Sequence, residues 1–237
     1  MLVAAALCPC PPLLVPEVAA GAAAELDPLR AACREAVDAL AAARPDRLVV
    51  VGPTDGAGQG PYPQGATGSF RGFGVDREVA LGTAPHPPGR PLPPALSVGA
   101  WLLAHATPVD APVAGLGVAE TLAPEDCLEA GREVAASAPR VALLVMGDGS
   151  ACRTVKAPGY YDERAAEYDA ALARALATAD TDALAALTPE EATALKATGR
   201  APWQILAGAA RAGRPLRGTL RHDEAPYGVG YFVASWA

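Results

Sequence analysis

The sequence has few of the features that accompany binding to nucleic acids or membranes. Only two of its 237 residues are lysine, Lys156 and Lys196, and the formal net charge at pH 7 is −7. Because no basic tract offsets this acidic balance, we expect binding neither to nucleic acid nor to an anionic membrane surface. No apolar run approaches the roughly 20 residues of a membrane-spanning helix. Small, neutral or metal-bound ligands remain open.

The segment Met1–Cys10 also lacks the features of an export signal. It has no basic residues before its apolar run, and that run of about seven residues is at the short limit for a signal peptide. We expect a buried first strand here and a cytoplasmic protein. The five cysteines, an odd number, are then expected to be reduced thiols.

Apolar segments of strand length alternate with amphipathic helical segments along the chain. This alternation predicts one α/β domain over residues 1–237, a sandwich with a central mixed or largely parallel sheet. The expected strands are Leu2–Leu7, Arg47–Val51, Val75–Leu81, Val113–Val118, Arg140–Met146, Leu216–Arg221 and Gly230–Ala234. The expected helices are Asp27–Ala43, Ala95–Ala106, Pro124–Ser137, Tyr160–Ala179, Thr188–Gly199 and Trp203–Ala212. Residues 55–74, rich in glycine, proline and polar residues, are predicted to form a long loop.

Ligand sites in such sheets lie at the carboxyl ends of the strands. This rule selects three segments, Cys8–Pro16, Gly52–Gly60 and Gly147–Arg153, and adds His222–Gly228 if that segment runs along the same edge. Other familiar motifs are missing from the sequence, since it has no phosphate-binding loop, no GxSxG turn and no pair of CxxC motifs. The alternating glycines of residues 56–60 also lack the third glycine and following helix of a dinucleotide-binding turn.

Together the four segments resemble those of the class III extradiol ring-cleavage dioxygenase superfamily. Cys8–Glu17 (CPCPPLLVPE) is similar to the family segment PHPPLLVPE, and Val49–Thr54 (VVVGPT) resembles a strand that ends in SPH. Met146–Ala151 (MGDGSA) resembles SGDLSH, and Glu224–Tyr231 (EAPYGVGY) resembles the closing YEAPYGVGY. Tyr160–Ala212 also has the family's order of a long helix, a Leu-Thr-Pro-Glu-Glu turn and a helix with tryptophan. The resemblance therefore covers nearly the whole chain.

The resemblance implies a site that this sequence has largely lost. In working members of the family, two histidines and a carboxylate hold iron(II), and a third histidine is the acid/base for the catechol substrate. The matching positions here are Cys10 and Thr54 for the iron-binding histidines, Ala151 for the acid/base and Glu224 for the carboxylate. A thiolate prefers zinc or copper(I), and neutral threonine is a poor ligand. Losing a general acid/base costs about 10² to 10⁴-fold in rate, so we expect no ordinary iron(II)-dependent ring cleavage.

The remaining polar residues allow functional and structural interpretations. The candidate catalytic residues are Cys10, Asp148, Cys152 and His222, and Cys10 with Glu224 is a candidate zinc site. The residues predicted to line a small-molecule pocket are Thr54, Asp55, Ser150, Ala151, Arg153 and Tyr227, with Ser150 and Arg153 as candidate anion ligands.

Each functional interpretation has a structural alternative. Asp148 is also placed to cap a turn or a helix, Cys8 to be a buried thiol at a strand end, and His222 to be a solvated loop residue. His86, in a second Pro-His-Pro-Pro segment, is expected on a loop, and His105 at the end of a helix.

Three functions remain open from the sequence. The first is a dioxygenase-like protein that no longer cleaves catechols but keeps a small-molecule pocket at the strand ends. The second is an enzyme with repurposed chemistry that uses a non-iron metal or a pocket cysteine. The third is a non-catalytic subunit of an oligomer, since proteins of the family often assemble as oligomers.

Overall fold

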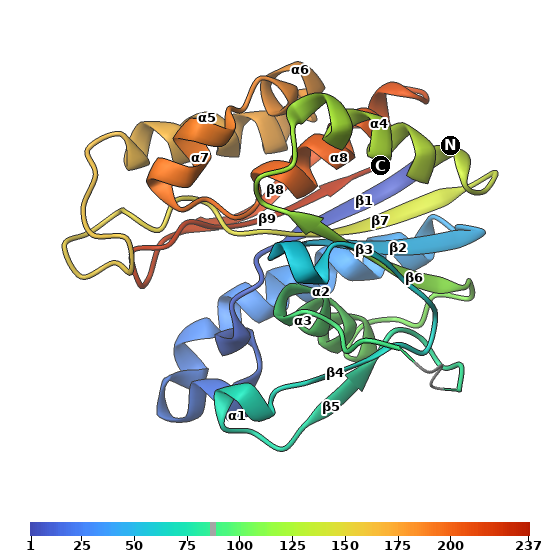
Figure 1. The fold of residues 1–237 in the computed structure, drawn as a ribbon, viewed down its shortest axis with the longest axis horizontal. Helices are drawn as coiled ribbons and strands as arrows, with labels where there is room; N and C mark the ends of the chain where they lie inside the picture. The colour runs from blue at the N-terminus through green and yellow to red at the C-terminus, as the bar shows by residue number, and fades with distance from the viewer. Residues whose placement is uncertain (86–88) are drawn as a thin grey trace.

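A computed structural model describes residues 1–85 and 89–237, and in these ranges one seven-stranded sheet lies between two layers of helices (Figure 1). Its strands are β1 (Leu2–Cys8), β2 (Arg47–Thr54), β3 (Gly60–Tyr62), β6 (Val113–Ala119), β7 (Val141–Met146), β8 (Gly218–Glu224) and β9 (Tyr231–Trp236). The order across the sheet is β3-β6-β2-β7-β1-β9-β8. β6, β2, β7 and β1 run parallel, and antiparallel strands flank them at both sides. The predicted single α/β domain with a mixed sheet is confirmed, and β7 is the middle strand of the seven.

The central strands are apolar on both faces because both faces are covered by helices. In β7, Ala142, Leu144 and Met146 belong to the core on one face, whereas Val141, Leu143 and Val145 belong to the core on the other. β1 and β2 divide between the two cores with the same period of two. These strands therefore have no interior position for a polar side chain, and polar groups gather where the strands end.

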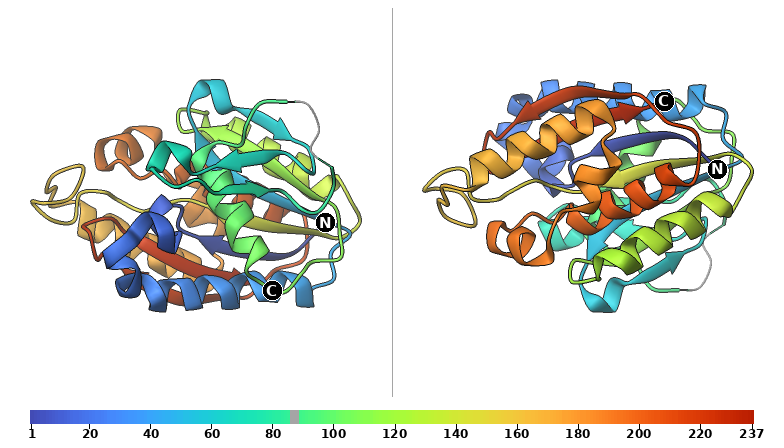
Figure 2. Two further views of the ribbon diagram at one scale, coloured as in Figure 1. Left: turned by 90° about the horizontal axis from the view of Figure 1, so that it is seen from below. Right: turned by 90° about the horizontal axis from the view of Figure 1, so that it is seen from above.

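The two helical layers are built from different parts of the chain (Figure 2). One face carries α1 (Pro16–Ala19), α2 (Asp27–Ala42), α3 (Pro94–Ala104) and the ribbon of β4 (Thr67–Ser69) and β5 (Glu78–Ala80). The other carries α4 (Pro124–Ala136), α5 (Ala165–Thr178), α6 (Thr181–Ala185), α7 (Pro189–Leu195) and α8 (Arg200–Arg211). Short 3₁₀ turns occupy Pro12–Leu14, Ala20–Leu26, Gly56–Gly58 and Arg71–Phe73. Within the described ranges, no helix combines the length and apolar character needed to cross a membrane.

Several expected elements differ from the structure. The segment Val75–Leu81 is not an edge strand of the main sheet, since only β5 is extended there and it pairs with β4. Residues 55–74 are not one long loop, because they include β3, β4 and two 3₁₀ turns. The helix expected from Tyr160 begins at Ala165, because Tyr160 has a left-handed φ of 64°. His86, expected on a loop, lies outside the described residues.

The second strand was expected to stop before Gly52-Pro53, but β2 continues to Thr54. Its pairing with β7 ends at Val51, whereas its pairing with β6 goes on as far as Thr54 and Ala119. Beyond Val51 one side of β2 is therefore free, and proline is tolerated at such an edge because no ladder hydrogen bond is needed there. The extension carries Thr54 to the end of the strand.

The close contact of α4 with α8 gives a stability prediction. A Cβ atom on Gly131 of α4 would overlap the carbonyl oxygen of Ile205 and lie 2.7 Å from the backbone nitrogen of Ala209. We expect Gly131→Ala to lower the free energy of unfolding by about 1–3 kcal/mol, because overpacking forces the backbones apart. Urea denaturation followed by circular dichroism measures the change.

Gly21→Ala is the matched control. No described atom lies within 4 Å of a Cβ placed on Gly21, so alanine there restricts the unfolded chain without a clash and leaves stability unchanged or raised by about 0.4–1 kcal/mol. Equal effects of the two substitutions would show that the α4–α8 approach does not limit stability.

Candidate functional site

The carboxyl ends of the parallel strands surround a cavity of about 570 Å³, here called the strand-end cavity. Cys10 follows β1, Thr54 ends β2, Glu120 follows β6 and Asp148 follows β7, and all four line this cavity. Its full lining is Cys10, Pro53, Thr54, Asp55, Ala57, Gly58, Tyr62, Arg90, Pro91, Leu92, Pro93, Pro94, Ala95, Glu120, Asp148 and Thr198. Parallel strands bring their carboxyl ends to one edge, which is why residues so distant in sequence meet there.

Asp148 joins three segments at the base of the cavity. Its Oδ1 accepts a hydrogen bond of 2.8 Å from the backbone N–H of Cys10. Its own N–H donates to Oγ1 of Thr198 at 3.2 Å, and its carbonyl accepts from the N–H of Gly199 at 3.0 Å. The side chain of Asp148 is thus bonded to the distant turn after β1, and not to its own loop or to a helix N-terminus as a local cap would be.

The protonation states of Asp148 and Cys10 favour proton exchange over nucleophilic attack. Burial raises the pKa of Asp148 to about 6, against the opposing effect of the hydrogen bonds from Cys10. Burial, and then the Asp148 charge, raise the pKa of the Cys10 thiol well above its usual value. Burial likewise raises the pKa of Glu120. At neutral pH the thiol is therefore protonated, while Asp148 titrates close to neutrality.

Two segments form the outer wall of the cavity. Asp55 caps the 3₁₀ turn Gly56–Gly58 by accepting from the N–H of Gly58 at 2.9 Å. The hydroxyl of Tyr62 donates to the carbonyl of Gly58, also at 2.9 Å. The exposed Asp55 and the buried Tyr62 are thus each held by a short local hydrogen bond.

Arg90 fastens these two segments together. Its guanidinium donates to the carbonyls of Ala57 at 2.9 Å and Gln59 at 2.7 Å. It also lies over the ring of Tyr62, 4.3 Å from the ring centre, which is a cation–π distance. Both terminal nitrogens of Arg90 therefore bond within the protein, and only the remaining N–H groups can bond to a ligand.

Ser150 and Arg153, expected to bind an anion in the pocket, instead bind a carboxylate of the chain itself. The N–H and hydroxyl of Ser150 donate to Asp169 at 2.9 and 2.8 Å, and Arg153 donates to it at 3.0 Å. Asp169 is buried on α5, and burial raises its pKa against the pull of these donors. The pair lies away from the strand-end cavity and holds α5 to the loop after β7.

Cys152 and Ala151 also lie away from the strand-end cavity. Cys152 is buried, and its thiol donates to the carbonyls of Gly159 at 3.5 Å and Leu195 at 3.4 Å. Burial raises its pKa, the opposite of what a nucleophilic thiol requires. The N–H of Ala151 bonds to the carbonyl of Leu195 at 2.9 Å. The loop bends toward α7 after Asp148, and so only Asp148 of the expected residues in this segment reaches the cavity.

The hairpin between β8 and β9 lies at the same edge of the sheet, but its expected site residues face elsewhere. His222 is in β8, not on a loop, and its Nε2 is 3.8 Å from Oε2 of Glu224, whose side chain is 66% exposed. The hydroxyl of Tyr227 donates to Glu25 at 3.0 Å, and Tyr227 lines a separate hollow beside Thr154. His222, Glu224 and Tyr227 are therefore not part of the strand-end cavity.

The residues present do not fit the iron site that the sequence resemblance implies. Cys10 and Thr54 share the cavity, but Glu224 does not reach it, so the expected pair of Cys10 and Glu224 is not formed. In residues 1–85 and 89–237, no group of three or more His, Cys, Asp and Glu side chains is arranged to hold a metal ion. A protonated thiol and a neutral hydroxyl are also poor partners for iron(II).

Four polar residues of the lining, Tyr62, Arg90, Glu120 and Thr198, were not predicted from the sequence. Glu120 is the second residue after the expected strand Val113–Val118, so the rule of carboxyl ends applied to that strand would have found it. Thr198 lies 50 residues after Asp148, and its place depends on the path of α7 and α8.

Among known proteins, one solved structure has a fold similar to that of this chain. No protein-family model matches the sequence, and no curated protein matches it. Among solved structures, the crystal structure of an uncharacterized protein from Escherichia coli K12 is similar over 99% of both chains, with 13% identity and a TM-score of 0.47. The function of the site is therefore argued from its own geometry.

The raised pKa of Asp148 predicts a pH-dependent effect of Asp148→Asn. The folded state binds the proton more tightly than the unfolded chain, so ionisation of Asp148 costs stability as the pH rises from about 4 through 6. Asparagine keeps the oxygen that accepts from Cys10 but carries no charge. We expect the variant to be more stable than the wild type by about 2 kcal/mol at about pH 8, and nearly equal at about pH 4.

Urea denaturation at the two pH values tests this expectation. Asp180→Asn removes an exposed helix-capping carboxylate far from the cavity and controls for the general loss of one negative charge. A variant that is less stable than the wild type at the higher pH would contradict the expectation.

The burial of all five cysteines predicts low thiol reactivity. We expect native protein near neutral pH to react with fewer than one equivalent of a thiol-specific disulfide reagent, and denatured protein with five. Rapid labelling of the wild type that Cys10→Ser abolishes would mean that Cys10 is an activated thiolate after all.

Proposed function

We propose that this chain is a divergent member of the class III extradiol ring-cleavage dioxygenase superfamily that binds a small polar molecule in the strand-end cavity without iron(II). One observation carries the proposal. Cys10 and Thr54, which match the two iron-binding histidines, line one cavity at the carboxyl ends of β1 and β2. Asp148, from a third matching segment, lies beside them and bonds to Cys10. The pocket is thus retained while its metal ligands are replaced.

The charges of the cavity favour a neutral or cationic ligand. Three carboxylates line it, those of Asp55, Glu120 and Asp148, whereas its one arginine, Arg90, is bonded to two backbone carbonyls. An anion, such as the catecholate that iron(II) would stabilise, meets uncompensated negative charge here. A ligand with hydroxyl or ammonium donors can bond to these carboxylates, and Leu92 offers an apolar contact.

A second candidate function is an enzyme that transfers a proton through Asp148. A carboxyl group with a pKa of about 6 gives and takes protons near neutral pH, which suits a general acid/base. The neighbouring hydroxyl of Thr198 and thiol of Cys10 would orient the bound group. This version of repurposed chemistry needs no thiolate, and the raised pKa values of Cys10 and Cys152 argue against a cysteine nucleophile.

We also propose a cytoplasmic location, supported by five free cysteines. A homo-oligomer, and with it a role as a non-catalytic subunit, stays a prediction that size-exclusion chromatography of the pure chain tests.

The proposal predicts how much iron(II) the protein retains and which of two catechols it binds more tightly. Protein purified without chelator and loaded anaerobically with iron(II) should retain far less than one equivalent of iron, and catechol with dioxygen should give no ring-opened product by absorbance. Dopamine, a cationic catechol, should bind about tenfold more tightly than catechol itself, because it meets the carboxylates of the cavity. Elemental analysis and calorimetric titration make these measurements.

Matched variants assign the binding to the cavity. Glu120→Gln and Asp148→Asn should each reduce the advantage of dopamine, whereas Glu167→Gln, at an exposed position on α5, should leave it unchanged. Stoichiometric iron with ring cleavage would refute the proposal, and so would dopamine binding that neither cavity variant affects.

A further inference from the structure

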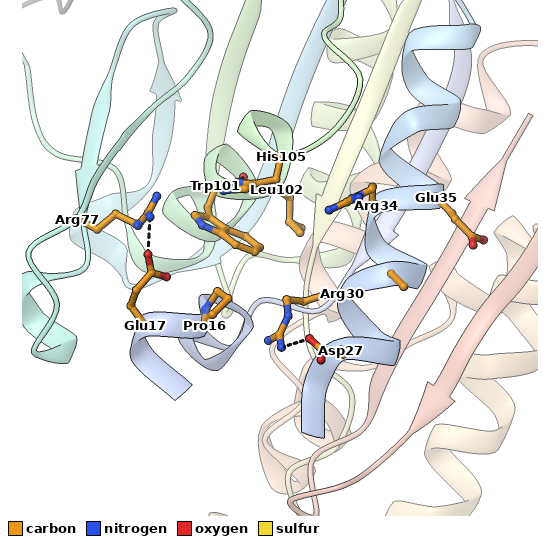
Figure 3. A pocket seen from close by; sticks show the side chains of 11 residues that line it. Pro16, Glu17, Asp27, Arg30, Arg34, Glu35, Arg77, Trp101, Leu102 and His105 are labelled. Carbon is orange, nitrogen blue, oxygen red and sulfur yellow. Dashed lines mark hydrogen bonds and ion pairs between the residues drawn. The ribbon is translucent and has the colours of Figure 1, made fainter. Parts of the chain in front are cut away.

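A second cavity, here called the helical cavity, has a volume of about 640 Å³ and lies between α1, α2 and α3 (Figure 3). Its lining includes Pro16, Arg30, Arg34, Arg77, Trp101 and His105. It shares no lining residue with the strand-end cavity. Both cavities nevertheless lie beside α3, whose first residues line one and whose last residues line the other.

The α3 side of the helical cavity presents two aromatic rings that are in contact and tilted to each other. The rings of Trp101 and His105 lie 4.3 Å apart between centres, with 31° between their planes. Nδ1 of His105 is 2.7 Å from the carbonyl oxygen of Trp101, which can only accept, so Nδ1 carries a proton. Nε2 is therefore the ring nitrogen left to meet a ligand. This surface suits a flat apolar group.

The indole N–H of Trp101 is a buried donor without a hydrogen-bond partner among the described residues. Trp101 is 5% exposed, so water does not compensate the loss in the manner of a surface residue. An unpaired buried donor is unusual in native proteins and indicates a partner that is absent from the chain itself. Among the described residues, Tyr168 Oη and Arg200 Nε are buried without a partner too, but of these three residues only Trp101 lines the helical cavity.

The charges around the helical cavity leave one cation without a partner. Each lining carboxylate is paired with an arginine: Glu17 with Arg77, Asp27 with Arg30 and Glu35 with Arg221. Of the lining arginines, Arg34 has no ion-pair or hydrogen-bond partner for its side chain in residues 1–85 and 89–237. Figure 3 shows Arg34 pointing from α2 across the cavity toward α3.

We propose that the helical cavity binds a small monoanion that carries a flat apolar group, such as an aromatic carboxylate. The carboxylate bonds to the guanidinium of Arg34, which offers a planar pair of donors. The ring lies against Trp101 and His105, with Pro16 and Leu102 beside them. This site is the opposite in charge preference to the strand-end cavity, and so the two would not compete for one ligand.

Calorimetric titration of the full chain with benzoate tests the site. Benzoate should bind saturably and quench tryptophan fluorescence, since Trp203 and Trp236 are wholly buried elsewhere and Trp101 is the described tryptophan that lines this cavity. Benzamide, the neutral isostere, should bind about tenfold more weakly, because it lacks the charge that Arg34 recognises.

Two arginine variants separate this site from non-specific attraction. Arg34→Gln should weaken benzoate binding about tenfold, whereas Arg174→Gln, an exposed arginine on α5 without a side-chain partner in the described chain, should leave it unchanged. Asp148→Asn should also leave it unchanged, which distinguishes this site from the strand-end cavity. No saturable binding, equal binding by Arg34→Gln, or loss of binding in Asp148→Asn would each overturn the proposal.

Discussion

The hydrogen bond from the Cys10 N–H to Asp148 holds together the edge of the sheet on which the strand-end cavity depends. Without an acceptor at this point, the turn after β1 would have an unpaired N–H in a protein interior. The loop after β7 would then be joined to this turn by the bond from the Gly147 N–H to the Cys8 carbonyl, at 3.0 Å. The backbone of Asp148 also bonds to Thr198 and Gly199, and these bonds fix the segment that joins α7 to α8. Burying a carboxylate at this junction costs free energy of folding. A functional role therefore explains the position of Asp148 better than a contribution to stability does.

Other buried charges of the molecule serve the fold alone. Arg200, 1% exposed, donates to the carbonyl of Leu122 at 2.7 Å and to Gln204 at 2.8 Å, and it also bonds to the carbonyl of Glu120. Asp169 is likewise satisfied by Ser150 and Arg153. Both side chains bond within the chain, although Nε of Arg200 has no partner among the described residues, and neither residue lines the strand-end cavity or the helical cavity. A buried charged residue is therefore a candidate for a function only where it also lines a cavity, as Asp148 does.

Much of the fold follows from apolar patterns, because continuous apolar strands such as Val141–Met146 fit only between two helical layers. The rule of carboxyl ends also brings Cys10, Thr54 and Asp148 to one place. It fails for Ser150, Arg153 and Cys152, because their partners lie far along the chain on α5 and α7. It fails for His222 since a residue within a strand takes its direction from the register, which a local sequence does not reveal.

Four of the residues around the strand-end cavity are proline: Pro53, Pro91, Pro93 and Pro94. Each proline ring fixes its backbone φ angle, so this part of the wall has little conformational freedom to lose when a guest enters. The entropic penalty of ordering loops on association is correspondingly small. The same rigidity prevents the wall from adjusting to guests of different outline. If the cavity binds a ligand as proposed, its rigid wall would then discriminate among neutral and cationic guests by their shape.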